Sequence, residues 1–312
     1  MAIAALVVAL AISANVWPAQ AAATIDVSVT AVTAAVKSHW TTVVYSSRAP
    51  LLLSNDGGPD HGGFRTYGLE SEPPLAEVAS VTKFVATAYG VGGKDLAITI
   101  AEPDSVLRVY ELPYFSPIKD AERMQLGDWS ALCPWKSRTG NPGCPVSRPS
   151  SGGKDAHNGD KNARQHCGAV QAFEAPFEAS ACAASHATSR MFLSTDGDKT
   201  VYALSLQKTT APLKLSKVAK AQEDITGLAV YVANDSCKDY VLVSSEDAIS
   251  VYTGAFDLVG TMKLSGYDGI EIRGLNVHQA STWQYPDGVV AYAIKSAKVN
   301  GFGVTSLSSA LE

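Results

Sequence analysis

Short runs of apolar residues alternate with polar turns along most of this chain. Runs such as Thr41–Tyr45 and Leu96–Ile100 are rich in β-branched and aliphatic side chains and are bounded by turn residues, which is typical of β-strands. Only the segment before Lys37 and the stretch Lys214–Glu223 could be helical, and both lack good capping residues. The pattern therefore predicts an all-β protein.

One hairpin pattern recurs along the chain: an apolar strand, a turn rich in Ser, Asp and Gly, and a second strand with an aromatic residue. Five copies are visible, at residues 51–69, 98–112, 191–204, 241–252 and 289–307. Tyr67 and Tyr110 are 43 residues apart, and Tyr202 and Tyr252 are 50 apart. The 92 residues between Tyr110 and Tyr202 equal two such steps, which indicates one hidden copy.

A repeat of about 40–50 residues with this chemistry is the signature of β-propeller blades, which bury their faces against each other around a ring. Six copies predict a six-bladed propeller in a single domain, residues 22–312. In it, the blade around 125–175 is poorly encoded or replaced by an irregular insert. An irregular β-sandwich with similar hairpins is the alternative.

The segment 137–171 has no strand pattern and is rich in Gly, Ser, Lys, Asp and Asn. A long insert of this kind is unusual inside a compact domain. Two explanations stay open. One is a functional loop, and the other is a misread reading frame or an unspliced intron that replaces a genuine blade.

The N-terminus predicts secretion. The apolar run Ile3–Ala14 and the small-residue pattern Ala19-Gln20-Ala21 indicate a signal peptide at residues 1–21, although a buried first strand or helix would have a similar composition. No other segment approaches the roughly 20 apolar residues of a membrane span. We therefore expect an extracellular protein that does not bind membranes.

The five cysteines have no CxxC spacing, which disfavours a zinc site. Cys133 could pair with Cys144, and Cys167 with Cys182, which would leave Cys237 single.

The chain has 30 acidic and 25 basic residues and a net charge of −5, so it lacks the basic surface of a nucleic-acid-binding protein. No nucleophile elbow, phosphate loop or HExxH motif is present. Carboxylates are better placed: Asp224 and Asp268 lead into apolar strands, Glu178 precedes another, and Asp196 lies in a hairpin turn. If blade ends converge on one mouth of a propeller, these oxygens would suit Ca²⁺. Ordinary turn chemistry also explains them.

Two segments resemble the β-propeller phytases. Asp224–Tyr231 followed by Tyr240–Glu246 is similar to that family's D-I-E-G-L-x-x-Y strand and its Y-L-x-x-S-S strand, and Asp268–Ile272 looks like its D-G-I-D-V element. Asp196 lies near an acidic family position. The resemblance extends from about Glu178 to the end, is limited to the hairpins between 41 and 112, and is absent between 137 and 171.

The resemblance implies a secreted six-bladed phosphatase that removes phosphate from myo-inositol hexakisphosphate (phytate) with the help of Ca²⁺. It implies Asp196, Asp224 and Asp268 as calcium ligands and Glu178 as a fourth. The chain departs from the family at four places. The family's early D-D-P-A-I-W element has no counterpart before Leu51. Thr226 replaces the Glu of D-I-E-G, and Asn55-Asp56 and the region around Glu102-Pro103 replace phosphate-binding cations.

Arg65, Lys94 and Arg108 are the cations that could compensate for these losses. No residue is indicated as the catalytic one, and the residues leave activity open. The alternative functions are a catalytically inactive propeller that binds a ligand or a protein, and a structural or cell-surface propeller. We expect a monomer.

Overall fold

The computed structural model describes most of the chain. The described residues are 23–29, 31–32, 42–45, 51–56, 63–69, 75–78, 82–91, 93–101, 106–124, 131–136, 142–143, 175–195, 197–206, 213–233, 238–266, 269–296 and 300–308. The signal peptide predicted at 1–21 lies outside them. No helix among these residues is long and apolar enough to cross a membrane.

The first two blades are antiparallel sheets in simple chain order. Blade 1 contains β3 (Thr42–Tyr45), β4 (Leu51–Asp56), β5 (Gly63–Gly68) and β6 (Ala76–Val78). Blade 2 contains β7 (Thr82–Val91), β8 (Lys94–Ala101), β9 (Val106–Glu111), β10 (Ser116–Pro117) and β11 (Arg123–Met124), with the 3-10 turn η1 (Lys119–Ala121) between the last two. The chain then forms a two-stranded ladder of β12 (Trp135–Lys136) and β13 (Pro142–Gly143).

The C-terminal half contains three more blades. Blade 3 contains β14 (Ala181–Ser185), β15 (Arg190–Ser194), β16 (Thr200–Ser205) and β17 (Ser216–Lys220). Blade 4 contains β18 (Gly227–Val232), β19 (Asp239–Ser244), β20 (Ala248–Thr253) and β21 (Leu258–Ser265). Blade 5 begins with β22 (Glu271–His278), β23 (Val289–Lys295) and β24 (Asn300–Ser306).

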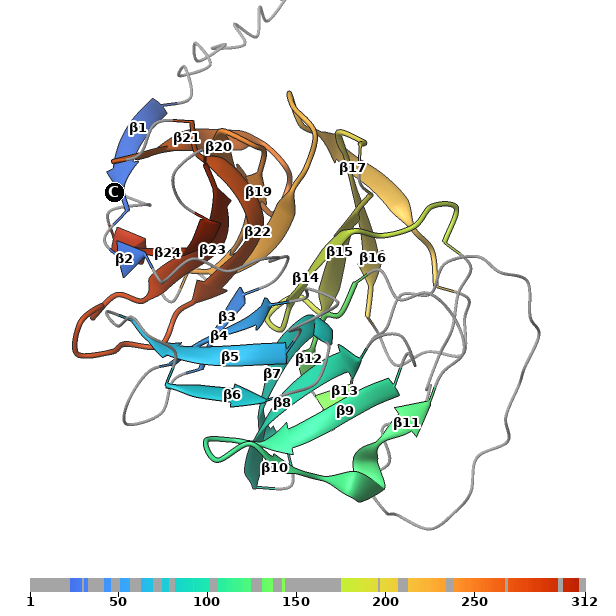
Figure 1. Cartoon of the computed structure of the whole chain (residues 1–312). Helices are drawn as coiled ribbons and strands as arrows, with labels where there is room; N and C mark the ends of the chain where they lie inside the picture. The colour runs from blue at the N-terminus through green and yellow to red at the C-terminus, as the bar shows by residue number, and fades with distance from the viewer. Residues whose placement is uncertain are drawn as a thin grey trace, which may run out of the picture.

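The N-terminal strands complete the last two blades. β1 (Ala23–Ser28) lies parallel to β21 as a fifth strand of blade 4, and β2 (Ala31–Val32) pairs with β24 as the fourth strand of blade 5. Figure 1 shows the blue N-terminal strands beside the orange and red C-terminal ones. The two ends of the chain therefore share sheets and close the ring.

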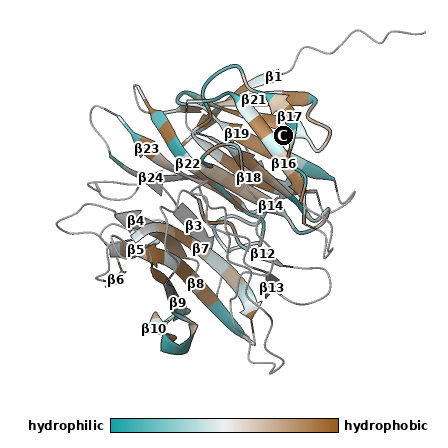
Figure 2. Cartoon of the chain, turned by 90° about the vertical axis from the view of Figure 1, so that its right-hand side faces the viewer, coloured by the Kyte–Doolittle hydropathy of each residue, from teal (hydrophilic) through white to brown (hydrophobic). Residues whose placement is uncertain are grey.

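The inner strands of neighbouring blades contact each other in the order β7, β3, β22, β18 and β14. Apolar side chains fill the spaces between the sheets. Leu53 and Phe64 of blade 1 pack against Val85 and Tyr110 of blade 2, for example. Figure 2 shows the hydrophobic colouring concentrated along the strands. Each large side chain buried in this way contributes about 1.5–3 kcal/mol to stability.

The predicted all-β propeller is confirmed, and all five visible hairpins are present as the second and third strands of the five blades. The predicted number of six blades is wrong, because the described residues form five. In the interval 125–175 the described residues contain the short β12–β13 ladder and no sixth four-stranded sheet. Within its described residues, the interval of 92 residues between Tyr110 and Tyr202 contains no second repeat.

Neither possible helix is present among the described residues. Lys214–Glu223 contains β17, which pairs with β16 at the edge of blade 3, and the described residues before Lys37 form β1 and β2. In both places pairing with a neighbouring strand decides the conformation, and local propensity cannot report such pairing.

Candidate functional site

The predicted site residues are placed by the alternating strand directions within each blade. The first and third strands of a blade start at one end of the ring, and the second and fourth start at the other. The segments before β14, β18 and β22 therefore lie at the same end as the turns between second and third strands. We call this end the upper face and the opposite end the lower face.

Glu178 and Asp224 occupy the same position in blades 3 and 4. Each lies three residues before the inner strand, whose first residue pairs with a serine at the end of the second strand: Ala181 with Ser194, and Gly227 with Ser244. The preceding backbone repeats as well. The Ser180 N–H donates to Ser194 O at 2.9 Å, and the Thr226 N–H donates to Ser244 O at 2.8 Å.

The equivalent residue in blade 5 is Glu271. The segments Asp224-Ile225-Thr226-Gly227-Leu228 and Glu271-Ile272-Arg273-Gly274-Leu275 share an acidic-Ile-x-Gly-Leu pattern. The two isoleucines also make the same bond. The Ile225 N–H donates to Asp198 O of the preceding blade at 3.4 Å, and the Ile272 N–H donates to Glu246 O at 2.7 Å. Glu271 was not among the predicted site residues, although an alignment of the two repeats finds it.

The two glycines of this pattern bring the inner strands of blades 4 and 5 close together. A Cβ at Gly227 would lie 2.9 Å from the backbone of both Gly274 and Leu275. Gly274 has a φ of +68° and lies at a bulge between Arg273 and Leu275, and its N–H donates to Thr226 O at 3.1 Å. Glycine is therefore required sterically at Gly227 and conformationally at Gly274.

The three equivalent carboxylates differ in their surroundings. Glu178 and Asp224 are exposed, and neither has an ion-pair partner within the part of the chain that the structure describes. Glu271 accepts a hydrogen bond from Arg273 at 3.1 Å and lies 3.7 Å from the Lys295 ammonium. The bond from Arg273, together with the charge of Lys295, holds the pKa of Glu271 below its ordinary value.

The carboxylates are of the right chemical type for calcium, which prefers hard oxygen ligands. Among the described residues, however, no group of three or more His, Cys, Asp or Glu side chains converges to hold a metal ion. Two of the predicted ligands, Asp196 and Asp268, lie outside the described residues. Glu178 and Asp224 are therefore the predicted ligands whose positions the structure describes.

The predicted phosphate-binding cations are dispersed. Arg65 is in β5 and pairs with Glu77 at 3.3 Å. Lys94 pairs with Glu111 at 2.5 Å and starts β8, at the lower face. Arg108 is half-buried in β9, opposite Thr99. Blade 5, whose Gly274 N–H is bonded to Thr226 O, presents Arg273 and Lys295, which were not among the predicted cations.

One disulfide is present among the described residues, and it differs from both predicted pairings. Cys133 is bonded to Cys182 across 49 residues of sequence. Cys144, Cys167 and Cys237 lie outside the described residues. Sequence spacing favoured short loops, whereas the fold brings the segment after blade 2 against the inner strand of blade 3.

No protein-family model and no curated protein matches the chain. Among solved structures, a luciferin-regenerating enzyme aligns with a TM-score of 0.53 at 14% identity, over 88% of this chain and 93% of its own. The β-propeller domain of Cps50 (Swd1) from Myceliophteria thermophila aligns with a TM-score of 0.52 at 10% identity, over 89% of this chain and 99% of its own. The chain is thus a β-propeller protein, and similarity at these identities establishes the fold alone.

Proposed function

We propose that this protein is a secreted, calcium-assisted phosphatase of the phytase type, with its site at the upper face. The observation that carries the proposal is the exposed acidic residue at the equivalent position in blades 3 and 4, Glu178 and Asp224, next to a blade whose equivalent Glu271 is paired with two cations. It agrees with the resemblance of the Asp224–Tyr231 segment to the β-propeller phytases. The Cys133–Cys182 disulfide supports export, since disulfides persist mainly in oxidising compartments.

In this proposal Glu178 and Asp224 hold the metal ion, together with Asp196 and Asp268. Bound calcium would supply charge stabilisation at the phosphate oxygens and a more acidic water molecule. Arg273 and Lys295 lie on the same face and replace part of the missing phosphate clamp. Glu271 orients both cations, so it serves as their counter-ion and does not act as a metal ligand.

A propeller that binds calcium or a ligand without turnover is the second candidate. Two observations favour it: Thr226 stands where the phytase family has a carboxylate, and Glu271 is already engaged by two cations. In this second candidate, the repeated acidic residues bind a ligand or calcium and do not take part in catalysis.

The test is phosphate release from phytate by the purified protein, with calcium and with a chelator. We expect calcium-dependent release, and Asp224→Asn should lower it by about tenfold or more because it removes a hard anionic ligand. Asp257→Asn is the matched control, since Asp257 is an exposed aspartate of the same blade in a lower-face turn. If the folded wild-type protein releases no phosphate, the phosphatase proposal is wrong.

A further inference from the structure

The junction between blades 2 and 3 differs from the other junctions of the ring. Between blades 1 and 2, 1 and 5, 5 and 4, and 4 and 3, the inner strands contact each other directly. Within the described residues, β7 of blade 2 and β14 of blade 3 make no comparable contact. The junction between blades 2 and 3, which we call the open seam, therefore needs another element to cover the facing apolar surfaces.

An extended segment fills the open seam. We call residues 131–136 the strap. Ala131 and Cys133 are only 3% and 5% exposed, and together with Trp135 they pack against blade 3 around Met191 and Leu193. Leu132, which lies between Ala131 and Cys133 in the sequence, packs on the opposite side of the strap.

Leu132 contacts blade 2. It lies against the apolar cluster that contains Leu96 and Ile98, and also against Phe84 and Ile100. Successive side chains of an extended segment point to opposite sides, so a single strand can cover two sheets at once. The strap thus covers apolar surface of both blade 2 and blade 3 at the open seam.

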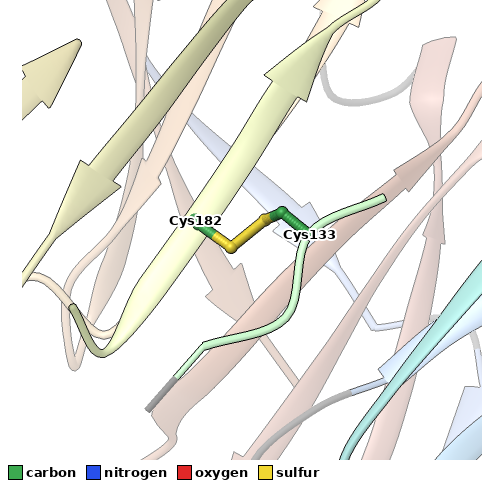
Figure 3. Close-up of a disulfide and its surroundings, with 2 residues drawn as sticks. All are labelled: Cys133 and Cys182. Atoms are coloured by element: carbon green, nitrogen blue, oxygen red, sulfur yellow. A yellow bond between two sulfur atoms is a disulfide. The ribbon is translucent and has the colours of Figure 1, made fainter. Parts of the chain in front are cut away.

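A covalent bond fixes the strap on one side. Cys133 of the strap is joined to Cys182 in β14, the inner strand of blade 3. Figure 3 shows the bond crossing from the strap to the neighbouring strand. On the blade 2 side, by contrast, the strap is held by the apolar contacts of Leu132.

We propose that the Cys133–Cys182 disulfide is a redox-sensitive latch, and that its reduction opens the ring at the open seam. An external dithiol would break the sulfur–sulfur bond, leave two cysteine thiols and become a disulfide itself. The strap then keeps its apolar contacts and the β12–β13 ladder. Blades 3, 4 and 5 remain joined through their inner strands, and β1 and β2 also connect blades 4 and 5, so the opening is local.

The test is hydrogen–deuterium exchange of the intact protein before and after reduction with dithiothreitol, with reduction verified by mass. Amides of β7 and β14, on the two sides of the open seam, should exchange about tenfold faster after reduction, as expected for local opening. Amides of β18 and β22, at the junction of blades 4 and 5, serve as the internal control. At labelling times too short for global unfolding, their exchange should change less than about twofold.

Two results would overturn the latch. Unchanged exchange at β7 and β14 would show that the apolar contacts hold the strap without the bond. An equal increase in every blade would show that the bond stabilises the whole fold and not the seam. The double variant Cys133→Ser/Cys182→Ser, untreated, should reproduce the reduced pattern. Leu132→Ala with the bond intact should speed exchange in β7 and leave β14 nearly unchanged.

Discussion

Two junctions of the ring are held together in different ways. One lies between blades 3 and 4, and the other lies between blades 2 and 3. At the first, the inner strands β14 and β18 contact each other, and Asp239 links the blades by accepting hydrogen bonds from Ser185 at 2.7 Å and from Thr188. At the second, the strap and its disulfide replace direct contact. A propeller can therefore close its ring with either complementary blade surfaces or a short covalently fixed segment.

Neighbouring blades also differ at the upper face, in the surroundings of their equivalent carboxylates. Blade 4 presents Asp224 without an ion-pair partner in the described part of the chain, whereas blade 5 presents Glu271 neutralised by Arg273 and Lys295. At equivalent backbone positions, blade 4 therefore has a carboxylate without an ion pair, and blade 5 has a carboxylate paired with two cations. Under the proposed function, the carboxylate of blade 4 would bind the metal ion and the cations of blade 5 would bind phosphate.

The largest expected effect comes from removing the disulfide. For a sequence separation of 49 residues, loop entropy gives about 4 kcal/mol, so Cys133→Ser/Cys182→Ser should lower the free energy of unfolding by about that amount. Urea unfolding of the variant against the oxidised wild type measures it. A loss below about 1 kcal/mol would mean that the strap is held without the bond.

The next effect tests the junction of blades 3 and 4. Asp239 is only 4% exposed and accepts bonds from two hydroxyl groups. Asp239→Ala removes the acceptor of both hydroxyl protons and should cost about 3 kcal/mol in unfolding free energy. Asp257→Ala, at an exposed position of the same blade, is the control and should change stability by less than about 0.5 kcal/mol. Equal stability of the two variants would contradict the role given to Asp239.

A smaller effect is expected where blades 4 and 5 approach each other. Gly227→Ala places a methyl group 2.8 Å from Ser244 Oγ and 2.9 Å from two backbone atoms, so overpacking should cost about 2 kcal/mol. At Gly254 the nearest atom would be Asp239 O at 3.3 Å, so Gly254→Ala should cost less. Thermal unfolding of both variants compares them, and the reverse order would argue against the tight approach.

The smallest effect is a change in pH dependence. The pKa of Glu271 is lowered in the folded protein from its ordinary 4.5, first by Arg273 and then by Lys295. Its contribution to stability is therefore complete above pH 4.5 and lost as the pH falls through the lower folded-state pKa. Glu271→Gln should flatten the fall in unfolding free energy in that acidic range. An unchanged pH profile would mean that the ion pairs do not form in solution.

The sequence predicted the features that depend on local pattern. Alternating apolar strands and polar turns located all five hairpins, and the acidic residue before an apolar strand located Glu178 and Asp224. Features that depend on distant contacts were missed. The pairing of Cys133 with Cys182 depends on the ring bringing the strap to β14, and the strand at 216–220 depends on its pairing with β16.

The number of blades and the third carboxylate were missed for different reasons. Regular spacing counted the interval between Tyr110 and Tyr202 as two repeats, but spacing cannot distinguish a blade from an insert of equal length. Glu271 was passed over in favour of Asp268, which lies three residues earlier in a Gly-containing turn. Aligning Asp224–Leu228 with Glu271–Leu275 finds the correspondence, and the equivalent backbone bonds of Ile225 and Ile272 confirm it.

The most direct test of the proposed site is a calcium titration by isothermal calorimetry of the wild-type protein, Asp224→Asn and the lower-face control Asp257→Asn. We predict saturable binding to the wild type and to Asp257→Asn, and binding to Asp224→Asn weakened by about tenfold or more, as expected when one hard oxygen ligand is lost. Equal binding by all three proteins, or no binding by any, would contradict a calcium site at the upper face.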